Sequence, residues 1–230
     1  MMQFPDKFTR WYRSERQKLS KMSARQKISY ILYYYKFHFL ALFLVFGIFL
    51  LGMQAWQNSR KTVLLDGLIT NDDFNRFPAQ EIAREYGDFI GRRKGEIILL
   101  DDGLYIDENG QAAEIASASR GKIIAEITTH SLDFTITEKS VLDEFHGQLP
   151  MMSLDRILPG DTFEALKPDM LSETQDDGSC CYYALSMRNS RFLRDAGGVP
   201  KEYYLFAPLY APHAGELARF IEWAFSPVNS

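Results

Sequence analysis

A run of twenty residues without lysine, arginine, aspartate or glutamate constrains this chain more than any other feature. The run covers residues 37–56, FHFLALFLVFGIFLLGMQAW, and His38 is its only ionisable side chain. A helix rises about 1.5 Å per residue, so such a run spans roughly 30 Å, the thickness of a bilayer's hydrocarbon core. Because a helix satisfies its own backbone hydrogen bonds, it is stable in lipid. The run predicts one transmembrane helix.

This segment is either a cleaved signal peptide or a retained signal anchor. A signal peptide has a short basic region, an apolar run of about 7–15 residues and a small-x-small cleavage site. Here 36 residues precede the run, the run is longer, and its exit offers Met53-x-Ala55 in place of Ala-x-Ala. These differences favour a retained anchor.

The charges on the two sides of the apolar run are opposite in sign. Residues 1–36 contain nine basic and two acidic residues, whereas residues 57–230 contain 17 basic and 28 acidic residues. The positive-inside rule therefore predicts a single-pass protein of the cell membrane, with a cytoplasmic N-terminus and an extracellular C-terminal domain. The lipid bilayer is its first expected partner. The acidic excess of the outer part argues against nucleic acid as another.

The basic tail, residues 1–36, is expected to be partly helical. Ser23 and Gln26 form a capping-box pattern, which predicts a helix running from Ala24 through the membrane to about Trp56. Near-helical apolar spacing before it leaves two interpretations open, an amphipathic helix on lipid headgroups or a positive flank that only fixes topology. The apolar positions are Phe4, Phe8, Trp11, Leu19 and Met22. An aromatic belt is expected from Tyr30, Tyr33, Tyr34 and Tyr35 beside Lys36.

A polar linker, residues 57–62, precedes an extracytoplasmic α/β domain, residues 63–226. Apolar runs and periodicity predict strands at 63–69, 96–101, 132–136, 181–187 and 203–207. The same signals predict helices at 78–90, 112–129, 138–146, 190–196 and 213–225, and one helical turn at 154–158. Alternation of strands and helices with short loops favours a parallel sheet covered on both faces.

Several stretches of the chain are similar to a known group of proteins. They are residues 22–27 (MSARQK), 31–38 (ILYYYKFH), 133–137 (DFTIT), 183–186 (YALS), 191–193 (RFL) and 218–225 (ARFIEWAF). On these residues the chain resembles uncharacterised single-span membrane proteins of Gram-positive bacteria, whose outer domain is similar to the type II periplasmic (solute) binding fold. The resemblance extends over most of residues 22–225 and implies no established activity.

The fold class expected from these observations is α/β. An N-terminal transmembrane helix is followed by a single-lobe, mostly parallel sheet with helices on both faces, like one lobe of a periplasmic binding protein. Two-lobed binders are longer than residues 63–226 allow, and the segment 149–179, where a second lobe would be inserted, is short. A cleft that closes between two lobes is therefore in doubt.

Polar residues follow three of the predicted strands. In open α/β sheets ligands bind beyond the carboxyl ends of strands, near helix N-termini. This rule makes candidate ligand-binding residues of Thr70, Asn71, Asp101, Asp102, Thr137 and Glu138. Their alternative role is that of ordinary turn and cap residues. Asp101 and Asp102 do not have EF-hand spacing, so we expect no metal site there.

Catalytic signatures are missing from the sequence. It contains no Gly-x-Ser-x-Gly elbow, HExxH, Walker loop or GxGxxG, and His130, His146 and His213 lack ligand spacing. We expect no cofactor and no enzymatic activity. Cys180 and Cys181 are adjacent, so a disulfide between them would form a strained ring, and two thiols facing opposite sides of a strand are expected instead.

Two functions from different classes remain open. The first is a membrane-anchored extracytoplasmic module that binds a small solute or a peptide at the predicted sheet edge. The second is a structural or assembly protein of the cell envelope that contacts other envelope proteins. It predicts an exposed apolar patch around Tyr203, Tyr204 and Tyr210.

Overall fold

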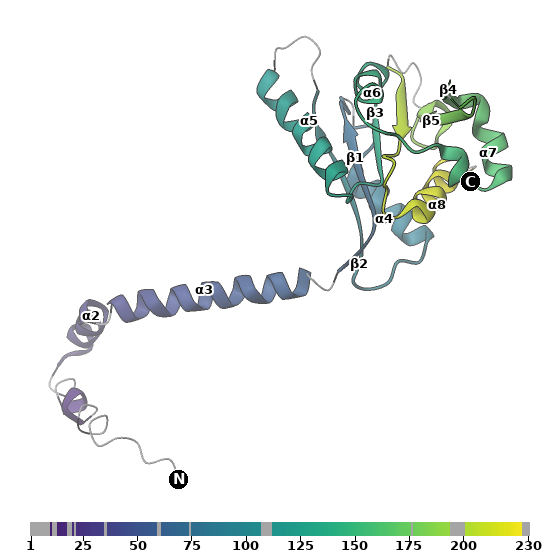
Figure 1. Cartoon of the computed structure of the whole chain (residues 1–230). Helices are drawn as coiled ribbons and strands as arrows, with labels where there is room; N and C mark the ends of the chain where they lie inside the picture. Colours follow the sequence, from purple (N-terminus) through teal and green to yellow (C-terminus); the bar gives the residue numbers. More distant parts are fainter. Residues whose placement is uncertain are drawn as a thin grey trace. The chain divides into compact units, whose positions relative to one another are not determined.

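The chain divides into two units, Met1–Arg60 and Lys61–Ser230, and each is described by itself (Figure 1). The computed structural model describes residues 10, 13–17, 20, 22–34, 36–58, 61–73, 75–106, 112–175, 177–193 and 201–226. Within these ranges the side chains of residues 27, 30–32, 34, 57 and 58 are not described. The predicted tail positions Phe4, Phe8, Trp11 and Leu19 lie outside the described residues.

The first unit contains helices α2 (Ala24–Tyr34) and α3 (Lys36–Asn58). The capping box is confirmed, because the backbone N–H of Ser23 donates to Gln26 Oε1 at 3.0 Å and that of Gln26 donates to Ser23 Oγ at 3.4 Å. A single helix was predicted from Ala24 to Trp56; the described residues give α2, which ends at Tyr34, and α3, which begins at Lys36, with Tyr35 outside the described residues. The apolar helix is therefore not at the N-terminus, because α2 precedes it.

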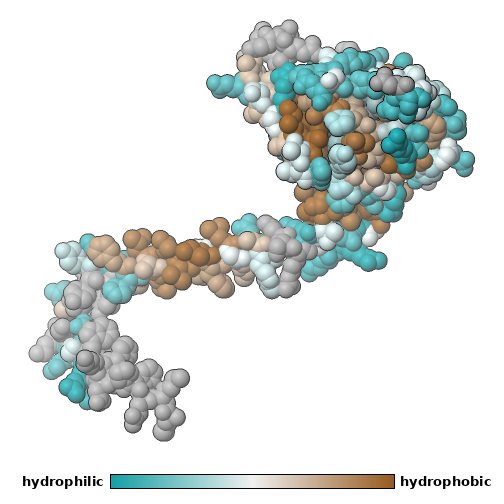
Figure 2. Space-filling model, in the orientation of Figure 1, coloured by the Kyte–Doolittle hydropathy of each residue, from teal (hydrophilic) through white to brown (hydrophobic). Residues whose placement is uncertain are grey.

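Helix α3 contains a stretch, Lys36–Trp56, that is long and apolar enough to cross a membrane. Its apolar side chains are exposed, and Figure 2 shows the helix as predominantly hydrophobic along this stretch. At its start the ammonium of Lys36 lies 5.4 Å from the ring centroid of Tyr33 and 5.1 Å from that of Phe37, within cation–π range. The side chains of Tyr30, Tyr34 and Tyr35, which complete the predicted belt, lie outside the described residues.

The second unit is built on one six-stranded sheet of order β2-β1-β3-β6-β5-β4. Its strands are β1 (Thr62–Thr70), β2 (Glu96–Leu104), β3 (Phe134–Glu138), β4 (Met170–Thr174), β5 (Cys180–Ser186) and β6 (Tyr203–Phe206). Strand β1 pairs parallel with β2 and β3, whereas β3–β6, β6–β5 and β5–β4 are antiparallel. The parallel arrangement that we predicted is thus confirmed only for β2, β1 and β3, because two of the five strand pairings are parallel and three are antiparallel. Strands β4 and β5 form a hairpin, which needs no crossover helix.

Helices cover both faces of the sheet, as predicted (Figure 1). They are α4 (Ala79–Phe89), α5 (Ala113–Thr128), α6 (Lys139–His146), α7 (Gly160–Leu166) and α8 (Ala214–Phe225). Short 3₁₀ turns are η1 (Leu154–Arg156), η2 (Lys167–Asp169) and η3 (Met187–Asn189). Within the described residues these elements form one lobe.

Neighbouring residues of β1 supply the two halves of the core. Ile69 packs in a cluster with Tyr86 of α4 and Phe220 of α8, whereas Leu68 packs in a second cluster with Ile123 of α5 and Phe145 of α6. This is the period-2 alternation of a strand buried on both sides. Gly67 of the same strand allows the ring of Phe134 to pack against the backbone. A Cβ at position 67 would lie 2.4 Å from that ring, which is too close for two carbon atoms.

Three elements differ from the prediction. Residues 190–196 were predicted as a helix, but η3 ends at Asn189, Ser190 is extended, and 191–193 form a turn, with 194–196 outside the described residues. Strand β4 and helix α7 were not predicted, because the prolines of their segment favoured irregular structure. Pro159 stands just before α7, where its missing N–H costs no hydrogen bond.

Candidate functional site

At the carboxyl ends of β1 and β3 the two predicted threonines meet. Thr70 Oγ1 and Thr137 Oγ1 lie 2.6 Å apart and form a hydrogen bond, and both residues are fully buried. Strands β1 and β3 pair directly, with Ile69 opposite Ile136, which places the two hydroxyls side by side. The prediction that these residues converge is confirmed, but they bind each other and face no cavity among the described recesses.

Asn71 also lies at this edge, where it joins three elements. Its backbone has a positive φ of 57°, which asparagine tolerates better than most residues. Its side chain donates to the carbonyl of Ile106 at 3.0 Å and accepts from the N–H of Ile106 at 2.7 Å. The hydroxyl of Tyr203 donates to its carbonyl at 2.7 Å. Asn71 therefore clamps the end of β1 to the segment after β2 and to β6.

Glu138 completes the edge through an ionic network. Lys201 Nζ lies 2.7 Å from Glu138 Oε1 and 2.7 Å from Asp73 Oδ2. Partial burial alone would lower the pKa of Lys201, but its hydrogen bonds to Asp73 and Glu138 outweigh that effect and raise the pKa above its usual value. Lys201 is therefore held as a cation between two carboxylates.

Asp101 and Asp102 do not lie at this edge, which contradicts the prediction. Strand β2 continues to Leu104, so Asp101 stands opposite Leu68 within the ladder. The two side chains point to opposite faces. Asp101 accepts from Lys122 of α5, and Asp102 Oδ2 accepts from the N–H of Ala79 at 2.9 Å, at the start of α4. Asp102 thus caps α4, the alternative role that the sequence left open.

The loop before α4 is held in place by Asp72. Its two carboxylate oxygens accept from the N–H groups of Arg76 at 2.7 Å and of Phe77 at 2.8 Å. A helix N-terminus with free N–H groups attracts anions. At α4 the carboxylate of Asp102 already accepts from the first helical N–H, that of Ala79. A shallow groove beside this start, of about 540 Å³, is lined by Arg76, Glu85 and Phe192 among others, and by none of the predicted site residues.

A more enclosed recess lies beside the β4–β5 hairpin, and we call it the hairpin recess. Its volume is about 310 Å³, within the range of small-ligand sites. The polar and titratable residues that line it are His146, Ser153, Arg156, Glu173, Cys181 and Tyr183, with Gln175 just after β4. They come from α6, η1 with the segment before it, β4 and β5, which are separate segments of the chain.

An acid–imidazole pair forms one wall of the hairpin recess. His146 Nε2 lies 3.3 Å from Glu173 Oε1, and the ring of His146 stacks on that of Tyr183 with centroids 3.9 Å apart. Burial, together with the charges of Asp143 and Glu173, raises the pKa of the Tyr183 hydroxyl despite the opposing charge of Lys139. Tyr183 is therefore a neutral donor at physiological pH.

Of the remaining lining side chains, Ser153 is engaged in hydrogen bonds of the fold, whereas Arg156 is exposed to solvent. Ser153 Oγ donates to Asp155 and accepts from the N–H of Tyr182 at 2.8 Å, so it anchors η1 to β5. Cys181 is buried and Cys180 is exposed, and both are free thiols, which confirms that they face opposite sides of the strand. Arg156 is exposed and brings a positive charge to the rim.

The described residues hold no cluster of three or more histidine, cysteine, aspartate or glutamate side chains arranged to bind a metal ion. The hairpin recess is not predicted from the sequence, because no local pattern identifies β4 as a strand. The turn signal at Asp177-Gly178, just before the apolar run of β5, is the signal that could have revealed the hairpin.

Fold and site together define a class, a mixed α/β domain joined to one helix that is long and apolar enough to span a membrane. Compared with protein-family models, with curated proteins and with solved structures, the chain has no match.

Proposed function

We propose that this chain is a membrane-anchored, non-enzymatic module that binds a small polar solute, or the end of a peptide, outside the cell in the hairpin recess. The observation that carries the proposal is that a basic and an acidic side chain both line one mostly polar recess. Glu173 and Arg156 both line the recess, together with His146 of α6 and Tyr183 of β5. Such a lining favours a ligand that presents a carboxylate and an ammonium group.

The predicted sheet edge supports binding less well. Thr70 and Thr137 bond to each other, and Glu138 is engaged by Lys201. A ligand there would have to break these interactions before gaining its own. In the hairpin recess Arg156 is solvent-exposed, so a ligand carboxylate reaches it without displacing a buried partner.

The apolar surface patch that was predicted for the assembly function is mostly buried. Tyr203 and Tyr204 are buried, with their rings in the two core clusters, and only Tyr210 of that patch is exposed. Their burial follows from the central position of β6 in the sheet, which the sequence did not reveal. Contacts with envelope proteins therefore stay a prediction, and the patch expected to make them is mostly buried.

A thermal-shift screen of the full chain in nanodiscs tests the binding proposal. The compounds are amino acids, short peptides, sugars, nucleotides and metal salts. A ligand at 100 times its dissociation constant stabilises the folded state by ~2.7 kcal/mol. For a domain of this size the thermal midpoint should rise by roughly 5–10 °C. We expect the rise with amino acids or peptides. No rise with any compound on folded protein would contradict the proposal.

A further inference from the structure

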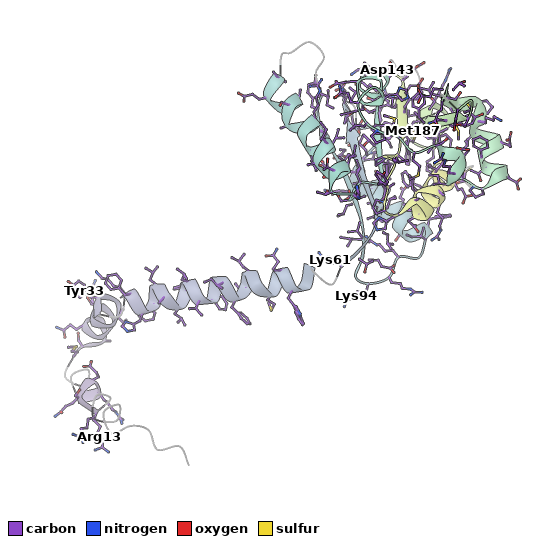
Figure 3. All side chains as sticks on the ribbon, in the orientation of Figure 1. Arg13, Tyr33, Lys61, Lys94, Asp143 and Met187 are labelled. Carbon is purple, nitrogen blue, oxygen red and sulfur yellow. The ribbon has the colours of Figure 1, made fainter. Side chains whose placement is uncertain are left out.

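The end of the domain opposite the Thr70–Thr137 edge carries a cluster of basic residues, which we call the basic tip. It consists of Lys61, at the start of β1, and Arg92, Arg93 and Lys94, in the turn between α4 and β2. The N–H of Thr62 donates to the carbonyl of Gly95 at 2.9 Å, so the turn and the start of β1 are neighbours. Figure 3 labels Lys61 and Lys94 at this same end of the domain.

The turn is held in shape by its own backbone. Arg92 N–H donates to the carbonyl of Gly87 at 2.9 Å, and Arg93 N–H donates to Glu96 Oε2 at 2.7 Å. Gly91 has a φ of +67°, a value that glycine adopts without strain. The basic side chains of the turn therefore project from a backbone whose shape these hydrogen bonds fix.

The basic side chains of the tip form no ion pair with the described residues, although the carboxylate of Glu96 lies in the same turn and accepts from the backbone N–H of Arg93. All four side chains are exposed, and none forms an ion pair within 4.0 Å with a described residue. Other basic residues of the domain do pair, as Arg120 does with Glu144 and Lys201 with Asp73. Within a domain of strongly acidic composition, the tip is a local positive site that fits an anionic partner.

An aromatic side chain stands beside these charges. Phe89, the last residue of α4, is 61% exposed. Its ring packs against those of Tyr86 and Trp223, whose centroids lie 6.3 and 6.5 Å from the Phe89 centroid. A supported but exposed phenylalanine next to lysine and arginine is the composition of a surface that lies at the headgroup region of a bilayer.

Chain connectivity limits how far the tip can be from a membrane. The apolar stretch of α3 ends at Trp56, and β1 begins six residues later, at Thr62. Six extended residues reach at most roughly 20 Å. A bilayer that holds α3 is therefore always within that reach of Thr62 and hence of the adjoining turn.

We propose that the basic tip, with Phe89, docks on anionic phospholipid headgroups at the membrane surface from which α3 emerges. Docking holds the amino-terminal ends of β1 and β2 against the lipid. The Thr70–Thr137 edge of the sheet then faces away from the lipid. This inference rests on α3 being inserted in a bilayer and is independent of solute binding in the hairpin recess.

Hydrogen–deuterium exchange of the full chain in nanodiscs tests the docking. Discs of phosphatidylcholine alone are compared with discs that also contain phosphatidylglycerol. We expect amides 91–95 to exchange at least several-fold more slowly in the anionic discs, and high salt to remove this protection because it screens exposed charges. Amides of α3 report in the same data whether the helix is inserted.

Charge reversal supplies the matched variants. Arg93→Glu/Lys94→Glu should lose the lipid-dependent protection, whereas Arg84→Glu/Arg188→Glu, which changes the net charge equally outside the tip, should keep it. Equal exchange of amides 91–95 in the two lipids, with α3 protected in both, would overturn the proposal. That comparison needs only the wild-type chain, so it decides the matter even if a variant folds poorly.

Discussion

The buried carboxylate of Asp133 binds both the backbone N–H and the imidazole ring of His213. Asp133 Oδ1 accepts from the N–H of His213 at 2.7 Å, and Oδ2 lies 2.9 Å from ring atom Nδ1. Oδ2 also accepts from the N–H of Asp66 at 2.8 Å. One side chain thus ties the middle of β1, 67 positions before Asp133, to the residue before α8, 80 positions after it.

Asp133→Asn should therefore destabilise the domain. An amide can accept from only one of the two backbone donors and presents its own N–H₂ to the other, so a buried N–H loses its partner. The expected loss is about 3 kcal/mol of unfolding free energy. Urea unfolding of the full chain, followed by near-ultraviolet circular dichroism, measures it. Asp143→Asn, at an exposed carboxylate paired with Lys139, should cost less than about 0.5 kcal/mol; equal losses in the two variants would argue against the account.

Asp66 should make the stability of the domain depend on pH. Burial, then the charges of Glu126 and Asp133, raise its pKa from 3.8 to about 6. Because the folded state holds this proton more tightly than the unfolded state, the stabilisation is complete below pH 3.8 and is lost as pH rises through about 6.

The matching variant is Asp66→Asn, which removes the ionisation. At pH 7.5 it should raise the unfolding free energy by about 1 kcal/mol, a value reduced for the partial exposure of the group. The gain should disappear near pH 4. Thermal midpoints of wild type and variant across this pH range test the sign, and a gain that is larger at pH 4 than at pH 7.5 would show it to be wrong.

The Thr70–Thr137 pair should behave as a structural hydrogen bond. Thr70→Val or Thr137→Val alone leaves one buried hydroxyl without a partner and should cost about 1–3 kcal/mol. The double variant removes both hydroxyls and should cost less than the sum of the two single losses. Urea unfolding of the four proteins forms the double-mutant cycle. Strict additivity would mean that the two hydroxyls do not interact.

Local sequence patterns predicted the parallel half of this domain well. Strands β1 to β3 are apolar runs separated by helices, so a period and a turn signal mark each of them. Strand β4 was missed because Met170–Thr174 has two apolar residues and lies at the edge of the sheet, where one side needs no burial. Pairing between β3 and β6 depends on contacts about 70 residues apart, which no local pattern encodes.

The candidate site was predicted only in part for a related reason. Asp101-Asp102-Gly103 reads as a turn, yet β2 is an edge strand in which the acids reach Lys122 and the start of α4 while the strand continues. Thr70 and Thr137 were found because parallel neighbours end at the same edge. The hairpin recess joins four separate segments, and its convergence exists only in the folded domain.

Calorimetric titration of the full chain in nanodiscs tests the central claim most directly, with an equimolar mixture of amino acids and dipeptides as the probe. Arg156→Gln/Glu173→Gln removes the opposite charges of the hairpin recess, and Lys167→Gln/Glu164→Gln removes an exposed pair outside its polar lining. The account predicts heat of binding for wild type and for the Lys167/Glu164 variant, and at least tenfold weaker binding for the recess variant. Equal binding by all three proteins, or no heat with folded wild type, would contradict it.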